Sequence, residues 1–149
     1  MIAITWAISC VFVPATAARN VVYPWHSVAV IAWSICVFLL IFAITIPFDI
    51  RDINYDAKDL KALPHLLNIN GSKILAICCL VGTIVIFFFF ILGSGTVHIK
   101  TLIAYMVWSS IAALLVMGSS SRRHEYYFSF LIDGSLLLLF PLLLLACNI

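Results

Sequence analysis

Charged side chains are scarce in this chain. They account for 9% of its 149 residues, whereas 65% of the residues are hydrophobic. An average soluble domain is about 25% charged and about 45–50% apolar. This imbalance excludes a soluble globular protein, an intrinsically disordered protein, a collagen-like protein and a nucleic-acid-binding protein. We therefore expect an integral membrane protein with a single transmembrane domain over residues 1–149, whose general partner is the lipid bilayer.

Recognisable cysteine and catalytic motifs are also missing. The five cysteines lie in or beside apolar runs without any Cys-x-x-Cys spacing, so we interpret them as small buried hydrophobic side chains and exclude a disulfide-stabilised secreted domain. The sequence contains no Walker, Gly-x-Ser-x-Gly or His-Glu-x-x-His motif, and its four histidines are scattered over different loops. Soluble hydrolase, nucleotide-binding and histidine-metal chemistry therefore find no support.

Long apolar runs are abundant by contrast. A helix needs about 20 mostly apolar residues to span a bilayer, and five runs approach that length. Their hydropathy is continuous and does not alternate with period two, which favours helices over the strands of a barrel. The sequence therefore predicts an all-α polytopic transmembrane helical bundle with about five spans, at 1–18, 28–47, 74–92, 101–117 and 128–147.

Basic residues are distributed unevenly between the expected loops. Six of the eight Lys and Arg residues lie between the second and third spans or between the fourth and fifth. If all five segments span the membrane, these two loops share one side, and the positive-inside rule places that side in the cytoplasm. We expect a cytoplasmic N-terminus and an external C-terminus, in a membrane such as the bacterial inner membrane. A transporter or channel subunit is disfavoured because the spans hold almost no charge.

One long polar segment, 48–73, interrupts the apolar pattern on the expected cytoplasmic side. It holds four of the six acids, at spacings of three, four and three residues: Asp49, Asp52, Asp56 and Asp59. If the second span continues as a helix past Pro47, these carboxylates lie along one stripe. Like charges at such spacings destabilise a helix by about 0.2–0.5 kcal/mol per pair, so a bound cation would explain the stripe. The alternative is a solvated loop of mixed charge.

Carboxylates one helical turn apart suit a magnesium ion. Each can give one oxygen to Mg²⁺, which proteins usually hold through one or two carboxylates together with the phosphates of a substrate. The metal then neutralises charge on a diphosphate leaving group. Three bases, Arg51, Lys58 and Lys61, fall on a different sector of the same helix, from which they can contact phosphate oxygens.

The run Asp-Ile-Arg-Asp-Ile-Asn-Tyr-Asp at positions 49–56, followed by two lysines, resembles the second aspartate-rich motif of the UbiA superfamily of intramembrane prenyltransferases. That motif has the form D-x-x-x-D, often with a further Asp three residues upstream. Asp52 and Asp56 match the pair, and Asp49 matches the upstream acid. The family has nine transmembrane helices, with this motif on the cytoplasmic side after the sixth. Five spans in this chain would correspond to the last five helices of that fold.

The resemblance implies a Mg²⁺-dependent transferase that moves an isoprenyl group from a prenyl diphosphate to an aromatic or other lipid-soluble acceptor. By this analogy Asp52 and Asp56 hold Mg²⁺ and Asp49 supports them. Arg51, Lys58 and Lys61 are the corresponding candidates for contact with the diphosphate.

The sequence departs from the family in one important respect. The first motif of the family, of the form N-x-x-x-D-x-x-x-D, is absent, and the two remaining acids, Glu125 and Asp133, are eight residues apart and do not replace it. The resemblance therefore covers most of this chain but only the second half of the enzyme. Three explanations stay open: a truncated gene product, a partner chain that supplies the N-terminal half, and a non-catalytic degenerate relative or membrane subunit.

Asp133 is the one acid within an expected span. An intramembrane acid is a functional candidate by default. A residue near a helix N-terminus can alternatively cap that helix or pair with neighbouring bases, here Arg122 and Arg123. Both interpretations are open from the sequence alone.

Overall fold

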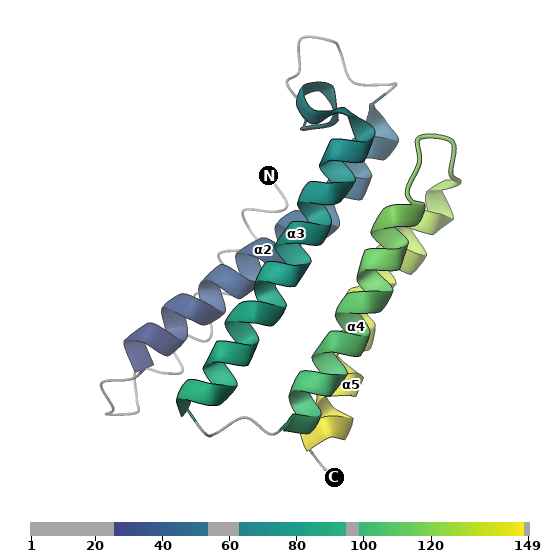
Figure 1. The fold of residues 1–149 in the computed structure, drawn as a ribbon. Coiled ribbons are helices and arrows are strands. Elements are labelled where there is room, and N and C mark those ends of the chain that lie inside the picture. The colour runs from purple at the N-terminus through teal and green to yellow at the C-terminus, as the bar shows by residue number, and fades with distance from the viewer. Residues whose placement is uncertain (1–25, 54–62, 95–98, 148–149) are drawn as a thin grey trace.

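A computed structural model describes residues 26–53, 63–94 and 99–147 of the chain (Figure 1). Within these residues the regular elements are all helices, as predicted, and no strand is present. The first expected span, 1–18, lies outside the described residues. The elements are α2 (His26–Asp52), α3 (Leu63–Ser94), α4 (Ile99–Gly118), the π-helical turn η1 (Tyr127–Ile132) and α5 (Asp133–Cys147).

Three of these helices are long and apolar enough to cross a membrane. The qualifying segments are Ser34–Asp52, Leu63–Phe89 and Ile99–Gly118, and a shorter apolar helix follows at Tyr127–Leu139. Large apolar side chains also cover the outside of the bundle, since Leu114, Phe130 and Leu137 are all more than two-thirds exposed. An exterior of this kind is expected where a protein contacts lipid. The described helices thus indicate an integral membrane protein.

Neighbouring helices run in opposite directions (Figure 1). The structure packs α2 against α3, α3 against α4, and α4 against α5. The C-terminus of α2, the start of α3, the C-terminus of α4 and loop 119–124 therefore lie at one end of the bundle. We call this the charged end, because it holds four of the five described basic residues, whereas Lys100 lies at the start of α4, at the opposite end.

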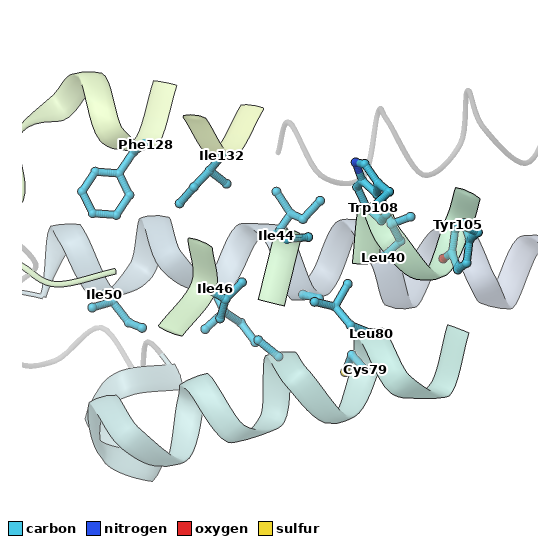
Figure 2. Close-up of a cluster of buried hydrophobic side chains, with 14 residues drawn as sticks. Leu40, Ile44, Ile46, Ile50, Cys79, Leu80, Tyr105, Trp108, Phe128 and Ile132 are labelled. Atoms are coloured by element: carbon cyan, nitrogen blue, oxygen red, sulfur yellow. The ribbon is translucent and has the colours of Figure 1, made fainter. Parts of the chain in front are cut away.

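Helix α2 passes through Pro47 and ends at Asp52. Proline removes one backbone hydrogen bond from a helix, but packing against neighbouring helices can compensate for that loss in a membrane bundle. Pro47 is buried here, and Ile46 and Ile50 beside it are fully buried (Figure 2). The acid stripe requires the helix to continue past Pro47, and this requirement is met as far as Asp52. The expected polar loop 48–73 is shorter than predicted, because its first residues extend α2 and its last ones belong to α3.

Helix α3 contains a sharp kink at Asn68. The backbone of Asn68 has φ 59° and ψ 164°, which separates a first turn from the long apolar part of the helix. Side chains other than glycine rarely adopt this conformation. The hydroxyl of Ser72 donates a hydrogen bond to the carbonyl of Asn68 at 3.0 Å. In Figure 1 the first turn of α3 consequently lies across the charged end instead of continuing along the helix axis.

The core lies where all the described helices meet. Figure 2 shows its largest side chains, among them Leu80 of α3, Trp108 of α4, and Phe128 and Ile132 of η1. The indole Nε1 of Trp108 donates to the carbonyl of Ser135 at 2.5 Å and so joins α4 to α5. A buried indole needs such a partner, because an unpaired polar group is costly in an apolar interior.

Candidate functional site

The last turn of α2 carries three of the residues that the sequence nominated. Asp49, Arg51 and Asp52 are all half-buried at the charged end. Asp49 and Asp52 are three residues apart on one helix and are therefore neighbours on its surface. The other three nominated residues, Asp56, Lys58 and Lys61, lie outside the described residues, so their roles stay predictions.

Arg51 and Asp52 form a two-pronged ion pair. The guanidinium Nε donates to Oδ1 of Asp52 at 2.6 Å, and Nη2 donates to Oδ2 at 2.9 Å. Both carboxylate oxygens of Asp52 thus accept hydrogen bonds from one cation. Pairs of this geometry are stronger than single-contact ion pairs, although the partial exposure of both side chains reduces the gain through solvent screening.

Two aromatic rings hold the Arg51 guanidinium between α2 and η1. Its central carbon lies 5.4 Å from the ring centroid of Phe48 and 5.7 Å from that of Phe128. The two ring centroids are themselves 6.0 Å apart. A guanidinium stacks favourably on aromatic faces at such distances. The ring of Phe128 is fully buried, so Arg51 is anchored at the junction between the two helices.

The helix that follows loop 119–124 brings two further acids to the same end. Both Glu125 and Asp133 attract the Arg51 guanidinium electrostatically, and Arg51 is the charge that acts on Asp133. Neither Arg122 nor Arg123 forms an ion pair in the part of the chain that the structure describes. The pairing of Asp133 with those two arginines, left open by the sequence, is therefore not found there.

Asp133 does not cap a helix N-terminus either. Its helix begins at Glu125, about two turns earlier, and continues through η1 into α5. The backbone N–H of Asp133 already donates to the carbonyls of Phe128 and Phe130. The capping interpretation is therefore wrong. The sequence did not show this because the fifth span was expected to begin at 128, where the apolar run starts, whereas the helix begins three residues earlier.

The C-terminus of α4 is fixed by hydrogen bonds from three segments. The last carbonyls of a helix have no partner within it. Here the hydroxyl of Tyr127 donates to Leu115 at 2.5 Å, Ser119 Oγ to Val116 at 2.7 Å, and Lys73 Nζ to Met117 at 2.9 Å. These bonds tie α3, α4 and η1 together at the charged end. The segment between Glu125 and Asp133 is thereby fixed to the C-terminus of α4.

The acids of α2 suit a magnesium ion in their chemistry. Mg²⁺ usually takes one or two protein carboxylates and completes its shell with water and substrate phosphate, and Asp49 and Asp52 supply two carboxylates. No group of three or more His, Cys, Asp or Glu residues that could hold a metal by itself is found among the described residues. The ion pair with Arg51 opposes metal binding at Asp52, because the guanidinium and a divalent cation would lie against the same carboxylate and repel each other.

A separate hollow of about 410 Å³ lies between α3 and α4. Its lining contains Asn70 and Lys73 as polar residues, with Ile74, Ile77 and Met117. It offers no carboxylate and is therefore not the acid site.

Comparison of the chain with known protein families, with curated proteins and with solved structures yields no match.

Proposed function

We propose that the chain serves as the catalytic C-terminal half of a UbiA-like prenyltransferase, with its diphosphate site at the charged end. One observation carries the proposal. Helix α2 runs unbroken through Pro47 and delivers Asp49, Arg51 and Asp52 within one turn to the mouth of an apolar bundle. Asp49 and Asp52 thus lie on one helix face, as expected for the upstream acid and the first acid of the motif, whereas the second acid, Asp56, lies outside the described residues.

Each residue of the motif has a proposed role. Asp52 and Asp56 hold Mg²⁺ with the support of Asp49, while Arg51 contacts the phosphate oxygens. When bound, Mg²⁺ would neutralise the charge of the departing diphosphate. The two lysines of the motif, Lys58 and Lys61, are further contacts for the same group. The isoprenyl chain, which is apolar, remains on the bilayer side of the charged end and passes to a lipid-soluble acceptor there.

The orientation follows from the same charges. Four of the five described basic residues lie at the charged end, and cytoplasmic ends of membrane proteins are enriched in Lys and Arg. We therefore assign the charged end to the cytoplasm, where water-soluble Mg²⁺ and diphosphate enter and leave.

The experiment is isoprenyl transfer in membranes that contain the full chain. A labelled prenyl diphosphate is supplied with a lipid extract as the source of acceptor, in Mg²⁺ and in EDTA. We expect label in the lipid fraction only with Mg²⁺, and its loss in Asp52→Ala and Asp56→Ala. Lys100→Gln, which removes a charge from the opposite end, should leave transfer unchanged. Transfer that persists in both aspartate variants, or no transfer by the unsubstituted chain, would contradict the proposal.

A non-catalytic membrane subunit is the second candidate. It is favoured by the Arg51–Asp52 pair, in which the motif acid already has a counter-charge without any metal, and by the absence of the first family motif from the sequence. Binding separates the two candidates. A catalytic half binds a divalent cation more tightly when inorganic pyrophosphate is present, whereas a subunit of purely structural function shows no such dependence.

A further inference from the structure

The hollow of about 410 Å³ between α3 and α4 opens to the outside of the bundle. Four of its lining residues share one face of α3, because they follow each other at helical spacing, and one comes from the end of α4: Asn70, Lys73, Ile74, Ile77 and Met117. Ile74 and Met117 are both more than half exposed. The volume lies within the range of clefts that hold small molecules, about 300–1,000 Å³.

The lining of the hollow changes from polar to apolar along the axis of α3. Asn70 and Lys73 lie nearest the charged end, where α3 begins, and Ile77 lies about one turn further along the helix. All of these residues belong to the segment Leu63–Phe89, which is long and apolar enough to cross a membrane. The polar mouth of the hollow therefore lies towards the lipid–water boundary, and its apolar part lies beside the lipid chains. A phospholipid has the same order of polar and apolar groups.

Lys73 gives the hollow a positive charge that is held in place. Its half-buried side chain donates from Nζ to the carbonyl of Met117 at 2.9 Å, which ties the ammonium to the end of α4. An ammonium has three N–H donors, so two can still bind an anion. In the part of the chain that the structure describes, the one ion pair is that of Arg51 with Asp52, so no carboxylate there neutralises Lys73. The hollow therefore favours a negatively charged group.

A single cation suits a phosphate diester better than a diphosphate. A diphosphate is usually neutralised through Mg²⁺, and the described lining offers no carboxylate to hold that ion. Basic pockets between transmembrane helices bind the headgroups of anionic lipids. We propose that the hollow binds an anionic phospholipid of the bilayer, whose phosphate contacts Lys73 and Asn70. One acyl chain lies along Ile74 and Ile77. The site is separate from the acids of α2, so this inference goes beyond the proposed function and does not depend on it.

The test counts the lipids that the full chain binds. The chain is purified in an uncharged detergent and titrated with phosphatidylglycerol, and the bound lipid is counted by native mass spectrometry. We expect one tightly bound phosphatidylglycerol. Lys73→Gln should weaken its binding about fivefold, the factor for one basic residue at a membrane surface, and Lys73→Arg, which keeps the charge, should not. Phosphatidylcholine should bind more weakly than phosphatidylglycerol, because its choline brings a second positive charge close to Lys73.

Lys100→Gln is the matched control. Lys100 is also a lysine near the end of a transmembrane helix, but it lies at the opposite end of the bundle. Its substitution should leave the binding of phosphatidylglycerol unchanged. The proposal is overturned if the two lysine substitutions weaken binding equally, if Lys73→Gln has no effect, or if phosphatidylcholine binds as tightly as phosphatidylglycerol.

Two further measurements test the hollow itself and the nature of its occupant. Ile77→Phe fills part of the hollow without changing its charge, so it should also weaken the binding of phosphatidylglycerol. Unchanged binding would show that the lipid lies outside the hollow, and the thermal midpoint in lipid-free detergent checks that the variant is folded. An excess of glycerol 3-phosphate or of inorganic pyrophosphate should not displace the lipid. Displacement by either one would assign the hollow to a water-soluble phosphate and overturn the proposal.

Discussion

Gly118 provides the sharpest test of the packing at the charged end. A Cβ atom on this glycine would lie 2.6 Å from the hydroxyl of Tyr127, which is the atom that bonds Leu115. In Gly118→Ala the hydroxyl has to move, which breaks that hydrogen bond and strains the turn. Overpacking costs about 1–3 kcal/mol, and a lost hydrogen bond about 1 kcal/mol. The helix propensity of alanine offsets at most about 1 kcal/mol.

We therefore expect Gly118→Ala to lower the stability by about 1–3 kcal/mol. Thermal unfolding in detergent should show a lower midpoint, by about 2–4 °C for each kcal/mol in a chain of this size. Gly134→Ala is the matched control, because a Cβ atom on Gly134 would have nothing within 4 Å of it. It should raise the midpoint slightly, since alanine is a better helix former than glycine.

A second substitution tests the cause. The Cβ of Gly118→Ala would lie 3.6 Å from Cζ of Tyr127, an ordinary contact, so only the hydroxyl is in the way. In a Tyr127→Phe background the alanine should therefore cost nothing more. Two results would contradict this cause: a Gly118→Ala variant as stable as the wild type, or an equal loss of stability in the Tyr127→Phe background. Either would show that the Tyr127 hydroxyl does not exclude a side chain at residue 118.

Three further substitutions test other parts of the fold by the same thermal assay. Asn68→Gly should stabilise the chain by about 1 kcal/mol, because glycine adopts φ 59°, ψ 164° without strain; a lower midpoint would show that the kink is not strained. Trp108→Phe should destabilise it by about 1–3 kcal/mol, since the buried carbonyl of Ser135 loses its donor, and an unchanged midpoint would contradict this bond. Lys73→Met should cost about 0.3–1 kcal/mol, the range for a cation at a helix C-terminus, and a larger loss would mean that Lys73 does more than bind Met117.

The helical class of the protein was predictable because it depends on composition and on the length of apolar runs. From the sequence, the continuation of α2 past Pro47 could be stated only as a requirement of the acid stripe. The burial of Ile46 and Ile50 explains why the helix does continue. The charged end follows the uneven distribution of Lys and Arg, which can be counted in the sequence. These features rest on local hydropathy and charge, which a sequence displays directly.

The features that the sequence did not reveal depend on packing between helices. The π-turn is not marked by any repeat of apolar residues, because its buried side chains, Phe128 and Ile132, are placed by the core that the helices form together. The kink at Asn68 was likewise not predictable, because the residue with the positive φ angle is an asparagine and not a glycine. We placed Asp133 near a helix start because the apolar run of the fifth span begins at 128, whereas the helix begins at Glu125. Its relation to Arg51 is a tertiary interaction that spacing along the chain cannot show.

The proposed function requires the aspartate motif to bind a cation together with diphosphate. The most direct measurement is the Mn²⁺ titration of the full chain with and without inorganic pyrophosphate, repeated for Asp52→Asn, Asp56→Asn and Lys100→Gln. We expect tighter binding with pyrophosphate, at least tenfold weaker binding in each aspartate variant, and no change in the lysine variant. Binding that is equally tight with and without pyrophosphate, or that is unchanged in both aspartate variants, would contradict the proposed function.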